Sequence, residues 1–177
     1  MSKQLGLPEY PEHKKNPLDI TSLGDAFQVE INYDMPLKQR IKWARFHHVD
    51  SELDRDVSSL VPNEGRQTKI ARFFHLTNFP EEYIPVQYPI HLMNTHGYNA
   101  GGLQELCVLA TIFPYISLYF PVIGMNSFWV KGVFIHAPAL SSCTHSWKRQ
   151  LTVVRISMEG DIFWPKHCRF LGVRTPR

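Results

Sequence analysis

The segment from Asn94 to Glu105 joins polar side chains to a pair of glycines, and it offers the densest set of ligand-binding groups in the chain. The candidate ligand-binding residues are Asn94, Thr95, His96, Tyr98, Asn99, Gly101 and Gly102. Glycine has no Cβ, so it lets a ligand approach the backbone closely. An apolar helix is expected to begin near Leu103, and the free amides at a helix N-terminus attract anions. This pattern favours a phosphate or nucleotide site.

The same segment also fits a capped turn that binds nothing. In that interpretation Asn99 caps the following helix, and the two glycines permit the chain to turn. The segment matches neither the Walker phosphate loop nor the Gly-x-Gly-x-x-Gly fingerprint of dinucleotide-binding proteins. Capping leaves His96 and Tyr98 without an explanation, so these two residues are the first to test by mutation.

A basic patch is predicted on the first helix of the chain. Lys38, Lys42 and Arg45 recur at a spacing that places them along one side of a helix. Such a surface suits nucleic-acid phosphates or an acidic partner, and a solvated helix face is the alternative. Neighbouring residues that add cations and a ring for stacking are Arg40, Trp43, His47 and His48. Residues that would extend the patch, if their strand lies alongside, are Arg66, Lys69 and Arg72.

Cysteine and histidine residues offer further chemistry, but their spacing gives no coherent site. Cys107 falls within the apolar helix, where a thiol is normally buried and inert. The remaining zinc-type ligands are Cys143, His145, His167 and Cys168. They are paired too closely for a zinc site, because neighbours on a strand point to opposite faces. We therefore expect no metal and no cofactor.

Two His-x-hydroxyl motifs would indicate a two-histidine phosphoesterase. His75-Leu-Thr77 fits such a motif, but His145-Ser-Trp147 lacks the second hydroxyl at the required position. Scattered surface or structural histidines explain these residues better than a phosphoesterase site does. No residue is assigned a catalytic role, and whether the protein is an enzyme stays open.

These residues are positioned by the elements of a predicted α+β fold. Strands are expected over 27–33, 69–76, 128–136, 150–158 and 162–173, with the last two pairing around a turn at 159–161. Residues 84–93 are expected to form an extended edge, because Pro85 and Pro89 cannot donate ladder hydrogen bonds. Helices are expected over 37–48 and 102–113, and a long loop over 50–67. The result is a mostly antiparallel sheet with two principal helices in a single compact domain.

Length and composition limit the class of protein. The 177 residues suffice for one domain with its own core, placed at 25–177 after an irregular, proline-rich arm at 1–24. The net charge of +3 is modest for a nucleic-acid binder. Three cysteines suit a reducing cytoplasm better than a disulfide scaffold. No signal peptide is recognised, and prolines interrupt the longest apolar stretch, so no membrane association is predicted.

Two segments, at 120–129 and 149–168, resemble small uncharacterised proteins of T4-like bacteriophages. The first reads Phe120-Pro-Val-Ile-Gly-Met-Asn-Ser-Phe-Trp129, and the second contains Ile156-Ser-Met-Glu-Gly-Asp-Ile-Phe-Trp164. The resemblance implies a small accessory protein made in the cytoplasm of an infected bacterium. It carries no catalytic motif, so it assigns no functional residue.

Two functions are consistent with these observations. The first is a small cytoplasmic accessory protein, encoded by a phage, that binds a host or viral macromolecule, with a protein as the expected partner and Trp43, Trp129 or Trp147 as the anchors to examine. The alternative is a nucleotide- or nucleic-acid-directed enzyme or binder that uses the 94–105 segment and the basic patch.

Overall fold

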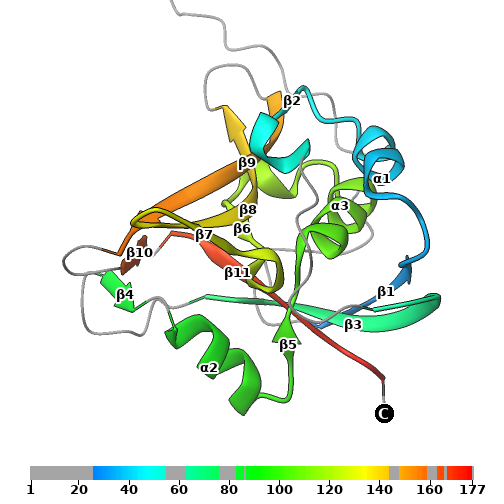
Figure 1. Ribbon diagram of the computed structural model, residues 1–177. Helices are drawn as coiled ribbons and strands as arrows, with labels where there is room; N and C mark the ends of the chain where they lie inside the picture. Colours follow the sequence, from blue (N-terminus) through cyan, green and yellow to red (C-terminus); the bar gives the residue numbers. More distant parts are fainter. Residues whose placement is uncertain are drawn as a thin grey trace, which may run out of the picture.

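The structure is a computed structural model that describes residues 26–54, 63–75, 83–85, 87–143, 148–158, 163–165 and 167–176. Within these residues a nine-stranded sheet separates helices α1 (Leu37–Ala44) and α3 (Leu103–Ile112) from helix α2 (Tyr88–Thr95) (Figure 1). The α+β class is confirmed. The predicted arm at 1–24 and the predicted turn at 159–161 lie outside the described residues.

The sheet is mixed, which corrects the prediction of a mostly antiparallel one. Its strands run in the order β1 (Phe27–Asn32), β3 (Arg66–Phe74), β11 (Arg169–Arg174), β6 (Val122–Ile123), β8 (Phe134–Cys143), β9 (Lys148–Ser157) and β2 (His48–Val49). The β11–β6 and β2–β9 pairs are parallel. In addition, β5 (Asn99–Ala100) pairs with β11, β7 (Trp129–Lys131) pairs with β8, and β4 (Tyr83–Pro85) forms a separate ribbon with β10 (Phe163–Pro165).

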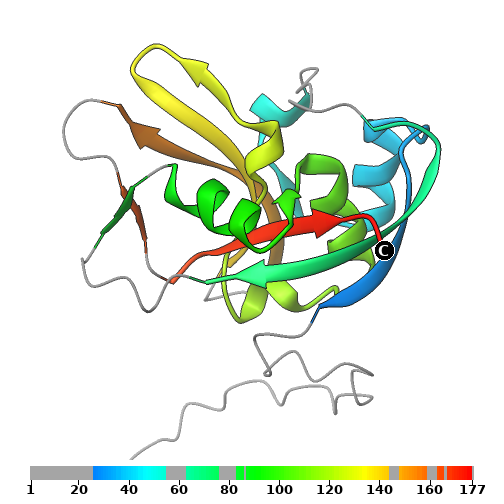
Figure 2. The same cartoon turned by 90° about the horizontal axis from the view of Figure 1, so that it is seen from below.

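Each face of the sheet carries its own hydrophobic core. On the side of α1 and α3, Leu106 packs with Leu140 and Val173. On the side of α2, Met93 packs with Phe170. Figure 2 shows α2 in front of the sheet, alongside β11. Because the two faces are separated by the sheet, surfaces on the α1 side and on the α2 side are distinct.

Local sequence patterns place β1, α1 and α3 correctly. In β1, Val29 and Ile31 are buried, whereas Gln28 and Glu30 are exposed, as alternation predicts. α3 is buried along most of its length, as its apolar sequence predicts. α1 ends at Ala44, earlier than predicted, because the next residue adopts a left-handed conformation with φ of 52°.

Helix α2 replaces the extended segment predicted at 84–93. Pro89 lies in the first turn of α2, where no intrahelical hydrogen bond needs its missing N–H. The proline that was taken to mark an edge strand therefore marks a helix start. Of the residues that the structure describes here, those of β4, which ends at Pro85, are extended.

Two of the strand predictions are wrong in their pairing. The single strand predicted at 128–136 is a hairpin of β7 and β8, with Gly132 in its turn at φ of 61°. The hairpin predicted between 150–158 and 162–173 is not formed, because β9 pairs with β8 and β2. β11 instead lies between β3 and β6.

Candidate functional site

The predicted ligand-binding segment divides between the surface and the interior. Asn94, Thr95 and His96 are exposed at the end of α2, where Gly97 turns the chain with φ of 73°. The hydroxyl of Thr95 donates to the carbonyl of Leu92 at 2.8 Å, and Nδ1 of His96 lies 2.9 Å from the same oxygen. The end of the helix therefore uses these polar groups itself. Tyr98, by contrast, is buried.

The two glycines of the segment serve close packing. A Cβ on Gly101 would lie 2.8 Å from Cγ of Leu171, and a Cβ on Gly102 would lie 2.5 Å from Oγ of Ser127. Both glycines are buried. The space that a glycine leaves open at each position is occupied by a neighbouring side chain, so it does not admit a ligand.

The first amides of α3 already have acceptors. The N–H of Gly102 donates to Oε2 of Glu105, and the N–H of Leu103 donates to Oγ of Ser127, each at 2.9 Å. A carboxylate thus occupies the position that an anionic ligand would need. The prediction that Asn99 caps this helix is wrong, because Asn99 lies on β5.

Glu105 also joins α3 to β1. Its Oε1 accepts a hydrogen bond of 2.6 Å from the hydroxyl of Tyr33, and both side chains are buried. Burial, together with the charge of Glu105 and the hydrogen bond to it, raises the pKa of the Tyr33 hydroxyl far above its usual value. Tyr33 therefore stays a hydrogen-bond donor at all physiological pH values.

The buried thiols of Cys107 and Cys168 are poor nucleophiles. Burial raises the pKa of Cys107 to about 12 and that of Cys168 to about 11, although nearby arginines act in the opposite direction. The part of the chain that the structure describes contains no group of three or more His, Cys, Asp or Glu side chains placed to hold a metal ion. Thr77 and His145 lie outside that part.

The predicted basic patch occupies the exposed side of α1. Lys38, Lys42 and Arg45 are all exposed, and Trp43 has 55% of its surface accessible. Arg40 does not belong to the patch, because it is only 4% exposed and its guanidinium donates to the backbone carbonyl of Asn32. The helix thus directs one cation inward and three outward.

Arg149 on β9 connects this side of α1 with α3. Its Nη2 donates to the carbonyl of Arg45 at 2.7 Å, and its Nη1 donates to the carbonyl of Ala110 at 3.2 Å. Its own carbonyl accepts from the N–H of His47 at 2.9 Å. Burial lowers the pKa of Arg149, while Tyr115, which is 47% exposed, acts in the opposite direction. Two helix ends, a strand and an exposed ring therefore meet at this guanidinium.

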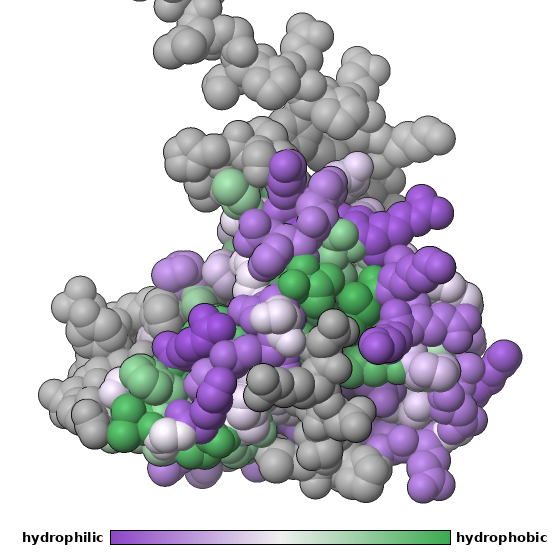
Figure 3. All heavy atoms as spheres, turned by 45° about the horizontal axis from the view of Figure 1, so that its top comes forward, coloured by the Kyte–Doolittle hydropathy of each residue, from purple (hydrophilic) through white to green (hydrophobic). Residues whose placement is uncertain are grey.

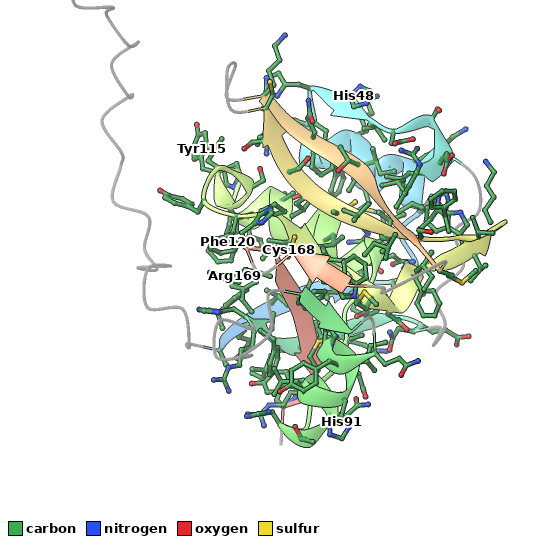
Figure 4. All side chains as sticks on the ribbon, turned by 90° about the vertical axis from the view of Figure 1, so that its left-hand side faces the viewer. His48, His91, Tyr115, Phe120, Cys168 and Arg169 are labelled. Atoms are coloured by element: carbon green, nitrogen blue, oxygen red, sulfur yellow. The ribbon has the colours of Figure 1, made fainter. Side chains whose placement is uncertain are left out.

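We refer to this surface as the α1–β9 face. It comprises Lys38, Lys42, Trp43, Arg45, His47, His48, Tyr115, Lys148 and Arg149. Figure 3 brings this end of the molecule forward and shows hydrophilic side chains spread over it, and Figure 4 shows His48 and Tyr115 at the end opposite to His91. Among the described residues, none of the lysines or arginines of this face forms an ion pair. Within the part of the chain that the structure describes, the positive charge of the α1–β9 face is therefore not compensated by an ion pair.

The cations considered as an extension of the patch do not join it. Lys69 on β3 is buried, with its Nζ 3.4 Å from Oγ1 of Thr175. Arg72 lies over the ring of Phe74, which belongs to the core on the α2 side. Arg66 is exposed and lies on the same side of β3 as Arg72, because the two are six positions apart and alternate residues of a strand share one face.

A charged cluster around Glu52 has no counterpart in the sequence analysis. The carboxylate of Glu52 lies 2.8 Å from Nδ1 of His136, 3.4 Å from Nζ of Lys131 and 3.5 Å from Nη2 of Arg155. Nη2 of the same arginine lies 3.4 Å from Oδ2 of Asp50. These residues come from separate elements, so no local motif signals their convergence.

Comparison with known proteins adds no relative. No protein-family model, curated protein or solved structure matches this chain. None of the helices in the described ranges is long and apolar enough to cross a membrane. Function must therefore be inferred from the surface of the protein itself.

Proposed function

We propose that the protein binds nucleic acid through the α1–β9 face. The observation that supports this is a row of exposed cations that form no ion pair with any described residue, together with the exposed rings of Trp43 and Tyr115. Lysine and arginine that neutralise phosphates release counterions, and this release supplies most of the affinity in sequence-independent binding. Aromatic rings beside such cations add stacking on the bases of single strands.

The spacing of the cations suits a phosphate backbone. Lys38, Lys42 and Arg45 follow about 10 Å of the α1 axis. Lys148 and Arg149 continue the positive charge beyond the end of the helix, because Arg149 is hydrogen-bonded to the carbonyl of Arg45. A nucleic-acid strand bound along these residues would therefore contact several cations in succession.

We propose that the protein acts as an accessory protein in the bacterial cytoplasm. Cys107, Cys143 and Cys168 form no disulfide, which suits a reducing compartment. The resemblance to small proteins of T4-like phages supports an infected bacterial host. Nucleic acid, as genome, transcript or replication intermediate, is abundant in that setting.

Salt-dependent binding tests this proposal. Replacing Lys38, Lys42 and Arg45 together by Ala should weaken binding of a fluorescent oligonucleotide and reduce the magnitude of the slope of log K against log salt concentration by about 2 to 3, because about three phosphate contacts are lost. Fluorescence anisotropy over a series of salt concentrations, with single- and double-stranded probes, measures both quantities.

Arg66→Ala is the matched control, because this residue is an exposed arginine away from the α1–β9 face. It should leave the slope nearly unchanged. An unaltered slope in the triple variant, or an equal loss in the control, would exclude the α1–β9 face as the binding surface.

An acidic protein is a second candidate partner. The exposed Trp43 beside arginine and lysine favours it, since Trp and Arg dominate the energetics of protein interfaces. Pull-down from bacterial lysate, with and without nuclease, separates the two partners. A stoichiometric protein that survives nuclease treatment and is lost in Trp43→Ala identifies a protein partner, whereas capture that requires intact nucleic acid identifies nucleic acid.

A further inference from the structure

The sheet face on the α2 side carries two arginines that the proposed function does not use. Arg72 lies on β3 opposite Gly172, and Arg174 lies on β11 opposite Ile70. The two arginines are therefore diagonal neighbours on adjacent antiparallel strands and share one face of the sheet. Diagonal positions are about 7–8 Å apart, so long side chains there can contact one ligand.

Each of these guanidinium groups lies over an aromatic ring. Cζ of Arg174 is 4.7 Å from the ring centroid of Tyr98, and Cζ of Arg72 is 5.4 Å from that of Phe74. The two rings meet edge to face with their centroids 5.3 Å apart. We refer to Arg72, Phe74, Tyr98 and Arg174 as the arginine–aromatic cluster.

The arginine–aromatic cluster also explains the two residues that helix capping leaves unexplained. The ring of His96 packs edge-on against Phe74 at 5.7 Å, so His96 and Tyr98 share Phe74 as a partner. The turn after α2 thus brings two rings to the sheet face beside the arginines. The segment thus contributes His96 and Tyr98 to this region, and the other groups come from β3 and β11.

Gly172 allows the rings to lie directly on β11. A Cβ at this position would lie 2.5 Å from Cε2 of Phe74 and 3.2 Å from Cβ of Tyr98. Phe74 and Tyr98 therefore pack directly against the backbone of β11 at Gly172. Rings held in this way restrict the guanidinium groups above them, which lowers the entropy lost when a ligand binds.

The positive charge of the cluster is not balanced within the described residues. Neither Arg72 nor Arg174 forms an ion pair there, and the Nε of each is shielded from solvent without a hydrogen-bond partner. On the described strands β1, β3 and β11, the one carboxylate on this face is that of Glu30. It lies on β1 opposite Thr68 and is exposed, so a strand separates it from Arg174.

We propose that the arginine–aromatic cluster binds a phosphate group, either as free phosphate or as a phosphomonoester. Two permanently charged guanidinium groups match the charge of a phosphate dianion, and their planar forks suit its oxygens in bidentate contacts. Stacking occupies one flat side of each guanidinium, and because each Nε is shielded from solvent, the N–H groups on Nη1 and Nη2 are the donors for the ligand. This site is independent of the α1–β9 face, since the sheet lies between them.

Isothermal titration calorimetry of the full chain with inorganic phosphate and with AMP tests this site. We expect saturable binding of at least one probe, weakened at least tenfold by Arg72→Gln and by Arg174→Gln. Arg66→Gln removes the same charge from the same side of β3 without removing a ring contact, and it should change the affinity less than twofold. Equal affinities for the two probes point to free phosphate, and tighter binding of AMP points to a phosphomonoester.

Arg174→Lys guards against a loss that merely reflects misfolding. It keeps the charge but loses the planar fork, so it should stay folded by circular dichroism and still bind several-fold more weakly than the native protein. Absence of saturable binding by both probes would overturn the proposal. So would equal weakening by Arg66→Gln, because that result would reduce the site to general surface charge.

Oligonucleotide binding separates this site from the proposed function. Arg72→Gln and Arg174→Gln should leave the affinity for oligonucleotides and its salt dependence unchanged. Conversely, the variant with Lys38, Lys42 and Arg45 replaced by Ala should retain phosphate binding. Either proposal can thus fail while the other stands.

Discussion

A single carboxylate, that of Glu52, holds three elements together at the edge of the sheet. It lies within 3.5 Å of nitrogen atoms from β7, β8 and β9, on Lys131, His136 and Arg155. Partial desolvation acts to raise the pKa of Glu52, but the hydrogen bonds with His136 and Lys131 and the charges of Lys131 and Arg155 outweigh it. The pKa of Glu52 therefore lies below its ordinary value of 4.5.

This lowered pKa predicts acid sensitivity. Because the carboxylate titrates at lower pH in the folded protein than in the unfolded chain, its stabilising effect is complete above the unfolded pKa and is lost as pH falls through the folded pKa. Glu52→Gln should therefore lower the free energy of unfolding at pH 7, and the difference from the native protein should shrink below about pH 4. Urea denaturation of both proteins at pH 7 and at pH 3.5 measures this difference in the free energy of unfolding.

Glu64→Gln is the control for this experiment, since Glu64 is exposed and its side chain forms no ion pair among the described residues. It should have little effect at either pH. A Glu52→Gln effect that is equal at pH 7 and at pH 3.5 would show that the charge of Glu52 is not what stabilises the protein.

At the scale of elements, the start of α3 is fixed by groups that are distant in sequence. Ser127 reaches Leu103 from a separate turn, and Glu105 turns back to the amide of Gly102. Gly102 can approach Ser127 only because it lacks a side chain. The junction between β5 and α3 is thus closely packed, and its amides are hydrogen-bonded within the protein.

Gly102→Ala should therefore destabilise the protein by about 1–3 kcal/mol, because the added methyl group displaces Ser127 and leaves the amide of Leu103 without its acceptor. The free energy of unfolding in urea gives the measurement. Asn99→Ala is the comparison: Asn99 is exposed on β5 and should cost less than about 0.5 kcal/mol. A larger cost for Asn99→Ala than for Gly102→Ala would restore Asn99 as the cap.

Elements governed by local periodicity could be predicted, and those governed by context could not. The alternation around Val29 and Ile31 is enough to place β1, and the apolar run from Leu103 is enough to place α3. Pro89 is compatible with an edge strand or with the first turn of a helix. The helix is the observed outcome, and it buries Met93 of α2 in the core on that side of the sheet. Gly132 likewise allows a turn without requiring one.

The candidate sites show the same division. The exposed positions of Lys38 and Lys42 follow from helical spacing alone, so they could be predicted. Arg45 is exposed as well, but it follows the end of α1 in a left-handed conformation, so helical spacing does not account for its position. The inward direction of the Arg40 side chain could not be predicted, because it depends on a hydrogen bond to the carbonyl of Asn32. The arginine–aromatic cluster brings Arg72 to Arg174 through strand pairing across the chain, and that register is invisible in local sequence.

At the scale of the whole molecule, β11 joins the two halves of the sheet. It pairs with β3 on one side and with β6 and β5 on the other. Its residues also serve both cores, since Leu171 faces the α1 side and Phe170 the α2 side. Without β11, the β1–β3 pair has no sheet neighbour among the described strands.

Truncation tests this dependence. A chain that ends before Arg169 should lose cooperative unfolding in urea, because it lacks the strand that both cores share. A chain that ends after Arg174 keeps β11 and should still unfold cooperatively, although it loses the contact between Lys69 and Thr175. Cooperative unfolding of the shorter chain would show that β11 is dispensable for the fold.

The position of β11 also sets an order of events during translation. The ribosome produces β3 long before β11, and Phe74 finds its partner only when Phe170 has emerged. Until then, one edge of β3 offers unpaired backbone groups, which is the arrangement most prone to pairing with another nascent chain. Folding of this sheet is therefore completed only after β11 has been synthesised, and the yield of the protein in a cell depends on how well the unpaired edge of β3 is protected until then.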